Sequence, residues 1–144
     1  MVDHVLVPYD GTPAAKSALE HATDRFPGAT LTLLYVMEPL AEYSRHRAFP
    51  GYPDDDSFSN EREKGEHLLE SARESISSDG TIQSELAVGE PGRAIIEYAD
   101  GHDVDHVIVG SHGRTGVARF LLGSTAEAVV RRSAVPVTVV RPDG

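Results

Sequence analysis

The chain has 144 residues and a formal net charge of -10, with 23 acidic residues against 13 basic ones. This length is typical of one domain, and the acidic balance excludes a general nucleic-acid or anionic-membrane surface, because such surfaces need a basic face. The chain has no cysteine, which excludes disulfides and thiolate chemistry, and it has neither an apolar run near ~18 residues nor a charged leader, so we expect one cytoplasmic domain over residues 1–144.

The apolar pattern alternates between two periods along the chain. Short, nearly continuous apolar runs indicate buried strands, and apolar residues repeated every three or four positions indicate helices. In chain order the sequence predicts a strand at residues 4–8, a helix at 13–26, a strand at 30–36, a helix from about 59 to 80, a strand at 81–88, a helix from 93 to about 101, a strand at 104–110, a helix from 124 and a strand at 135–140. This alternation predicts an α/β protein with a parallel sheet between helices.

Three local features refine this pattern. Thr12 before a proline predicts a helix N-cap, and the spacing of Ser124 and Glu127 fits a capping box. The strand at 81–88 alternates apolar with polar residues, as a strand at a sheet edge does. Residues 38–58 are predicted to form a polar loop. The composition of this loop fits both a lid and a disordered segment. Its acidic run at 54–56 is interpreted as solvated surface and not as a cation site.

A glycine run follows the predicted strand at 104–110. It contains Gly110, Gly113, Gly123, Ser124 and Thr125, in the spacing G-x2-G-x9-G-[ST]. This is neither the dinucleotide fingerprint G-x-G-x-x-G nor a Walker A loop, because no lysine stands at the required place. A glycine loop between a strand and a helix presents backbone N–H groups and a positive helix end, which favour phosphate.

This spacing resembles the nucleotide-binding signature of the universal stress protein family. Residues 5–12, 89–99 and 135–142 also resemble, in the correct order, the family's first strand, its third-strand exit with the following helix, and its closing strand. The resemblance implies a Rossmann-like fold of the adenine nucleotide alpha hydrolase type. Its open five-stranded parallel sheet has the order 3-2-1-4-5, with helices on both faces.

In that order the first and fourth strands are neighbours whose chains leave in opposite directions, and ligands of open α/β sheets bind at such a switch point. The resemblance implies that Asp10 contacts the adenosine end and that Val36 and the adjoining backbone of Met37 line the adenine slot. By its charge, Arg114 either neutralises a terminal phosphate or is a solvated surface residue. The full predicted binding set comprises Pro8, Tyr9, Asp10, Thr12, Val36, Met37, Gly110, Ser111, His112, Gly113, Arg114, Gly123, Ser124 and Thr125.

The preferred functional hypothesis is a regulatory protein of the stress response that binds ATP, or ADP or AMP, with magnesium bridging the phosphates. One alternative is a slow ATP hydrolase or phosphotransfer enzyme that uses Arg114 and ligand-borne magnesium, with Asp10 or His112 near water. A second alternative is an interaction module with a vestigial site. No residue is placed by spacing to position an attacking oxygen, so we predict no catalytic residues.

Two further expectations concern metals and partners. His102 and His106 stand beside aspartates, but their place near a strand favours exposed surface over a metal site, and no protein metal site is predicted. Residues 135–140 form an apolar strand that the implied order places at a sheet edge, and such edges are usually covered. The resemblance implies a homodimer in which this strand pairs with its copy.

Overall fold

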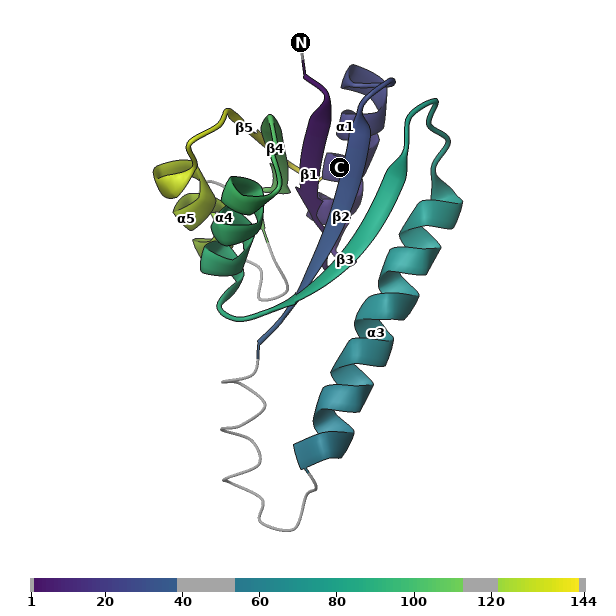
Figure 1. Cartoon of the computed structure of the whole chain (residues 1–144), viewed down its shortest axis with the longest axis vertical. Helices are drawn as coiled ribbons and strands as arrows, with labels where there is room; N and C mark the ends of the chain where they lie inside the picture. The colour runs from purple at the N-terminus through teal and green to yellow at the C-terminus, as the bar shows by residue number, and fades with distance from the viewer. Residues whose placement is uncertain (1, 39–53, 113–121, 143–144) are drawn as a thin grey trace.

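A five-stranded parallel sheet of order β3-β2-β1-β4-β5 organises the fold, as predicted. The computed structural model describes residues 2–38, 54–112 and 122–142. Figure 1 shows the strands twisting past one another with helices on both sides. The elements are β1 (His4–Pro8), α1 (Pro13–Arg25), β2 (Thr30–Met37), α3 (Asp54–Ser75), β3 (Ile82–Val88), α4 (Pro91–Gly101), β4 (His106–Gly110), α5 (Ser124–Arg132) and β5 (Val137–Val140).

Each face of the sheet has its own hydrophobic core. On one face, α1 and α3 pack against strand residues such as Val7 and Leu33, which are fully buried. On the other, α4 and α5 pack against Leu6 and Leu34, and Figure 1 shows these two helices side by side. Successive side chains of a strand point to opposite faces, so the continuous apolar runs of β1 and β2 are the expected result of burial on both sides.

Helix starts agree with the sequence at α1 and α5 and differ at α3 and α4. Thr12 caps α1, because its hydroxyl oxygen accepts the N–H of Ala15 at 3.3 Å. The third predicted helix begins earlier than expected, because the carboxylate of Glu90 accepts the N–H groups of Gly92 and Arg93 at 3.1 and 2.9 Å and caps α4. A carboxylate at a helix N-terminus also interacts favourably with the helix dipole.

The acidic run at residues 54–56 was predicted to lie in a loop, and this placement is wrong. These residues form the first turn of α3, so the helix begins at Asp54 and not near Ser59. Acidic residues are favoured in the first turn of a helix, where backbone N–H groups are unpaired. The rest of the predicted loop at 38–58, for which both a lid and a disordered segment were considered, falls mainly on residues 39–53, which lie outside the described residues.

Close packing at the end of β4 explains one glycine of the predicted signature. A Cβ built on Gly110 would lie 2.8 Å from the carbonyl carbon of Ala14 and 2.9 Å from its Cβ. The first turn of α1 therefore rests directly on the end of β4. The sequence suggested that Gly110 is bare so that a phosphate can approach, whereas the structure shows that its side is filled by α1.

We expect Gly110→Ala to destabilise the fold by about 1–3 kcal/mol, because the added methyl group meets backbone that cannot move cheaply. Urea denaturation measures this loss. Gly101→Ala is the control, since a Cβ at Gly101 meets nothing within 4 Å, and its stability should equal or exceed that of the parent chain. Equal stability of both variants would show that the contact at Ala14 is not tight.

Removing the α1 cap tests the local account of this helix. Thr12→Ala should lower the free energy of unfolding by about 1–2 kcal/mol, because the N–H of Ala15 loses its acceptor. Thr12→Ser keeps the hydroxyl and should recover most of that loss in the same urea titration. A Thr12→Ala variant as stable as the parent would contradict the assignment of Thr12 as the cap.

Candidate functional site

The ends of β1 and β4 form the centre of the candidate site. The two strands pair in parallel, with Val5 opposite His106 and Leu6 opposite Val107. From β1 the chain continues into α1 on one face, and from β4 it continues toward α5 on the other. This divergence creates the topological switch point at which open α/β sheets bind ligands.

The turn after β1 fixes a carboxylate at this point. One oxygen of Asp10, Oδ1, accepts the N–H of Thr12 at 3.1 Å and its hydroxyl at 2.6 Å. Gly11 between them has φ +81°, a conformation that disfavours other residues. The second oxygen, Oδ2, makes no hydrogen bond to a described residue. Asp10 thus stabilises the turn through one oxygen and keeps an acceptor for a ligand on the other.

Pro8 and Tyr9 support this turn from below. Pro8 is the last residue of β1 and pairs with Leu34 of β2. The N–H of Tyr9 donates to the carbonyl of Leu34 at 2.8 Å, and the Tyr9 side chain is buried in the core under α1 and α3. Burial, with a smaller contribution from the charge of Asp10, raises the pKa of Tyr9. Tyr9 is therefore a packing residue whose phenol stays protonated.

Two backbone hydrogen bonds anchor the segment after β4. The N–H of Ser111 donates to the carbonyl of Val140 on β5, and the N–H of Gly123 donates to the carbonyl of Ser111, both at 2.8 Å. Residues 111 and 123 are therefore joined although eleven residues separate them. Gly113 and Arg114, which the sequence assigned to the phosphates, lie outside the described residues.

The side chains of Ser111 and His112 contact each other. The Ser111 hydroxyl lies 2.8 Å from Nδ1 of His112, and Ser111 is only 3% exposed. A buried hydroxyl cannot approach a substrate in water, so this pair lacks the geometry of a serine nucleophile with its base.

The start of α5 differs from the predicted capping box, which is wrong. Gly123 is the N-cap, no side chain caps the helix, and Ser124 is already its first residue. Glu127 does not reach back, because its carboxylate pairs with Arg131 at 2.9 Å. The side chains of Ser124 and Thr125 make no hydrogen bonds to described residues. Their hydroxyls and the first-turn N–H groups are consequently available to an anion.

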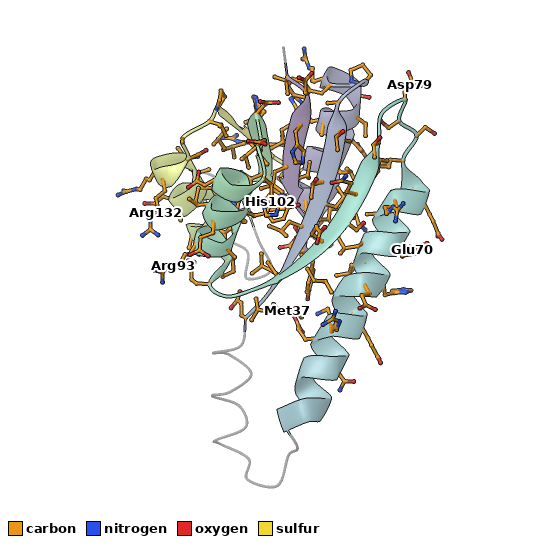
Figure 2. The ribbon with its side chains drawn as sticks, viewed as in Figure 1. Met37, Glu70, Asp79, Arg93, His102 and Arg132 are labelled. Atoms are coloured by element: carbon orange, nitrogen blue, oxygen red, sulfur yellow. The ribbon has the colours of Figure 1, made fainter. Side chains whose placement is uncertain are left out.

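Val36 and Met37 lie at the end of β2, one strand away from β1, and Met37 is labelled there in Figure 2. The Val36 side chain packs toward the core under α4 and α5, whereas Met37 is buried in the core under α1 and α3. The carbonyl of Met37 accepts the N–H of Gly89 at 2.9 Å. The two side chains thus point to opposite faces of the sheet, and the predicted adenine slot involves Val36 and only the backbone of Met37.

The structure brings together most of the described residues that the sequence selected. Asp10 is bonded to Thr12, the first turn of α1 lies against Gly110, and Ser111 is bonded to Gly123. These contacts place the Oδ2 atom of Asp10, the ends of β1 and β4 and the N-terminus of α5 together at the carboxyl ends of the strands. Such a set can hold a ligand with hydroxyl groups at one end and anionic oxygens at the other.

One long-range contact near the carboxyl ends of the strands was not predicted. The hydroxyl of Tyr35, which is fully buried on β2, donates to Oε1 of Glu61 on α3 at 2.6 Å. This bond holds α3 against the sheet beside the candidate site. No local pattern predicts this bond, because the sequence around Tyr35 is typical of a buried strand and that around Glu61 is typical of an exposed helix face.

The histidines considered as metal ligands have other partners. Nδ1 of His102 lies 2.9 Å from the carbonyl of Tyr98, and the two rings stack with centroids 3.8 Å apart. Nε2 of His106 lies 2.7 Å from the hydroxyl of Thr138, and burial lowers the pKa of His106. Across residues 2–38, 54–112 and 122–142 no group of three His, Asp or Glu side chains is placed to hold a metal ion.

In the same ranges no helix has both the length and the apolar character of a membrane span.

Solved structures of similar fold cover nearly the whole chain. A structure of protein MJ0577 from Methanocaldococcus jannaschii superposes with a TM-score of 0.85 at 26% identity and covers 100% of this chain and 99% of that one. A universal stress protein solved in complex with cAMP has a TM-score of 0.67 at 24% identity. An Arabidopsis thaliana family protein with AMP bound has a TM-score of 0.68 at 18% identity, and an Archaeoglobus fulgidus protein with dAMP has one of 0.63 at 20%. The last three likenesses concern the fold alone.

Sequence relatives carry the same family name. Universal stress protein A homolog 2 of Coxiella burnetii is 34% identical and is matched over 100% of this chain and 94% of the relative. Universal stress protein YxiE of Bacillus subtilis is 32% identical over 98% of this chain and 100% of the relative. The model of the universal stress protein family matches residues 1–141. The chain therefore belongs to the universal stress protein family.

Proposed function

We propose that this chain is a regulatory protein of the stress response that binds an adenine nucleotide, ATP in particular, at the ends of β1 and β4. One observation carries the proposal: two groups that can bind a ligand lie at this switch point. They are the Oδ2 atom of Asp10, which has no hydrogen bond to a described residue, and the start of α5, which has no side-chain cap. The solved relatives with AMP, cAMP and dAMP support the choice of an adenine nucleotide.

The two ends of the site suit the two ends of a nucleotide. Oδ2 of Asp10 accepts hydrogen bonds from ribose hydroxyls, and Val36 offers an apolar surface to the base. The N–H groups and hydroxyls of Ser124 and Thr125 bind phosphate oxygens, with Gly113 and Arg114 as further phosphate contacts. Magnesium that accompanied the nucleotide would be held mainly by the ligand, as is usual for this ion, and would offset the negative charge of the phosphates.

The geometry favours a role through occupancy over turnover. Hydrolysis of ATP needs a group that positions water in line with the terminal phosphate. Among the described residues, the hydroxyl–imidazole pair at the site is Ser111 with His112, and its hydroxyl belongs to a residue that is only 3% exposed. A slow hydrolase and a vestigial site therefore remain weaker candidates than a protein whose nucleotide state is its signal.

The role of Asp10 can be separated from its structural role. Asp10→Asn keeps an oxygen that accepts from Thr12 but replaces the free oxygen with an amide that cannot accept from ribose. We expect the affinity for ATP, measured by isothermal titration calorimetry, to fall about tenfold. Asp24→Asn, the same change on an exposed residue near the far end of α1, should bind as the parent chain does. Parental affinity in Asp10→Asn would remove Asp10 from the site.

We also propose that the chain forms a homodimer through β5. In the parallel ladder with β4, Thr138 and Val140 direct their backbone groups inward, which leaves those of Val137 and Val139 pointing away from the sheet. The side chains of β5 are half-buried, and Val130 on α5 is 47% exposed. An open apolar edge of this kind is suited to pairing with a second copy about a two-fold axis.

Val139→Pro tests this dimer, because proline removes an outward N–H while leaving the ladder to β4 intact. Light scattering at micromolar concentration should give a dimer mass for the parent chain and a monomer mass for this variant. Ser84→Pro is the control, since it removes an outward N–H from the opposite edge strand, β3, and should leave the dimer mass unchanged. A monomeric parent chain would contradict the proposal.

A further inference from the structure

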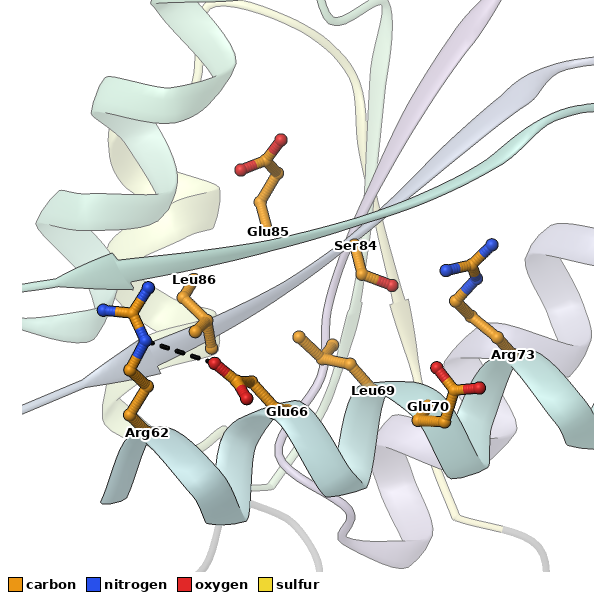
Figure 3. Close-up of a pocket in the computed structure, with 8 residues that line it drawn as sticks. All are labelled: Arg62, Glu66, Leu69, Glu70, Arg73, Ser84, Glu85 and Leu86. Atoms are coloured by element: carbon orange, nitrogen blue, oxygen red, sulfur yellow. Dashed lines mark hydrogen bonds and ion pairs between the residues drawn. The ribbon is translucent and has the colours of Figure 1, made fainter. Parts of the chain in front are cut away.

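A groove of about 370 Å³ runs between α3 and the edge strand β3. Its walls are Arg62, Glu66, Glu70 and Arg73 on α3 and Ser84 and Leu86 on β3, as Figure 3 shows. The buried side chain of Leu69 also lines it. This groove lies at the outer edge of the sheet, two strands away from β1 and four from β5.

The backbone of β3 offers free hydrogen-bonding groups to this groove. In the parallel register Leu33 is opposite Ser84 and Tyr35 is opposite Leu86. The bonds of such a ladder go to the residues on either side of each partner, so the N–H and C=O groups of Ser84 and Leu86 point away from β2. No other described backbone group bonds to them. The edge is therefore an open template for an added strand.

The groove also contains a polar atom without a partner. The hydroxyl of Ser84 is buried and makes no hydrogen bond among the described residues. In Figure 3 it lies between the strand and α3, near the end of the groove marked by Arg73. A buried hydroxyl without a partner is destabilising. Its presence beside an unpaired edge indicates a surface that is completed by another molecule.

The charges of the groove select the kind of occupant. Along α3 the order is Arg62, Glu66, Glu70, Arg73, so the carboxylates lie in the middle. Glu66 forms an ion pair with Arg62, in which Oε1 lies 3.1 Å from Nε. Glu70 and Arg73 have no ion pair among the described residues. Glu85 projects from β3 on the side away from α3 in Figure 3. An added strand would thus meet Glu66 and Glu70, which lie between the two arginines, on one face and Glu85 on the other.

The same order disfavours a second copy of this chain. If two β3 edges paired about a two-fold axis, the antiparallel α3 helices would bring Glu66 of one copy near Glu70 of the other. Like charges would then face each other, at a cost that adds to the repulsion between two chains of net charge -10. A basic segment avoids both costs.

We propose that the groove between α3 and β3 binds an extended, lysine- or arginine-bearing segment of a partner protein, which adds a strand to the free edge of β3. Backbone hydrogen bonds to Ser84 and Leu86 supply affinity, and Glu66, Glu70 and Glu85 supply selectivity for basic side chains. This site is separate from the proposed nucleotide site, and its occupancy does not require a nucleotide.

The test uses the full chain and a fluorescein-labelled hexapeptide of sequence TVKKVT, with TVEEVT as its charge-reversed counterpart. Fluorescence anisotropy should show saturable binding of TVKKVT that weakens as salt rises, and at least tenfold weaker binding of TVEEVT. TVKKVT with alternate backbone amides methylated should also bind at least tenfold more weakly. Equal affinity for the lysine and glutamate peptides would overturn the proposal.

Variants locate the binding on the protein. Glu66→Lys with Glu70→Lys should weaken TVKKVT binding about tenfold. Glu63→Lys with Glu74→Lys makes the same charge change on exposed positions of α3 outside the groove, and its effect should stay below about twofold. Equal effects of the two pairs of substitutions would show that the peptide binds by general charge attraction and not in the groove, and would overturn the proposal.

The edge itself is tested by Ser84→Pro, which removes an outward N–H and should weaken TVKKVT binding, whereas Val139→Pro on the opposite edge should not. Circular dichroism shows whether each variant folds, and the methylated peptide tests the same hydrogen bonds without changing the protein. A fall in oligomeric mass for Ser84→Pro would identify a second copy as the occupant and contradict the proposal.

Discussion

The close approach of α1 to the end of β4 is the constraint on which the site depends. Because Gly110 has no side chain, the first turn of α1 rests on the strand at Ala14. This contact brings the turn that carries Asp10 to the point where the chain leaves β4. A larger residue at position 110 would push α1 outward and separate the two halves of the site. The glycine therefore shapes the candidate site through packing between elements.

A second constraint connects the site to the edge of the sheet. Ser111 donates its N–H to Val140 at the end of β5, and its carbonyl accepts from Gly123 at the start of α5. One residue thus joins the segment after β4 to the edge strand and to the helix whose N-terminus faces the site. A shift at the start of α5 would strain the bonds that also hold β5, which connects the proposed nucleotide site with the proposed dimer edge.

The sequence predicts those parts of the fold that depend on local patterns. Buried parallel strands such as β1 and β2 give continuous apolar runs, and Thr12 followed by proline marks a helix start, so both were found with small errors at their ends. Glu90 was missed because glutamate is an uncommon N-cap. The cap at Ser124 was wrong because the backbone bond from Gly123 to Ser111, which no local pattern contains, sets the start of α5.

The candidate site divides in the same way. The order of the strands and the spacing of the motifs predict that Asp10 and Gly110 lie near each other, because carboxyl ends of neighbouring parallel strands meet at one edge. The bond from Tyr35 to Glu61 and the groove beside β3 depend on how α3 crosses the sheet. That crossing follows from packing between distant segments, and periodicity alone carries no information about it.

The most direct test of the central claim is a titration of the isotope-labelled protein with ATP, followed by its two-dimensional amide spectrum. The account predicts saturable shifts in the amide signals of residues 9–12, 110–112 and 122–125, with those of β3 unchanged. These residues surround the switch point between β1 and β4. Absence of shifts at millimolar ATP, or shifts confined to another part of the sheet, would contradict nucleotide binding at this site.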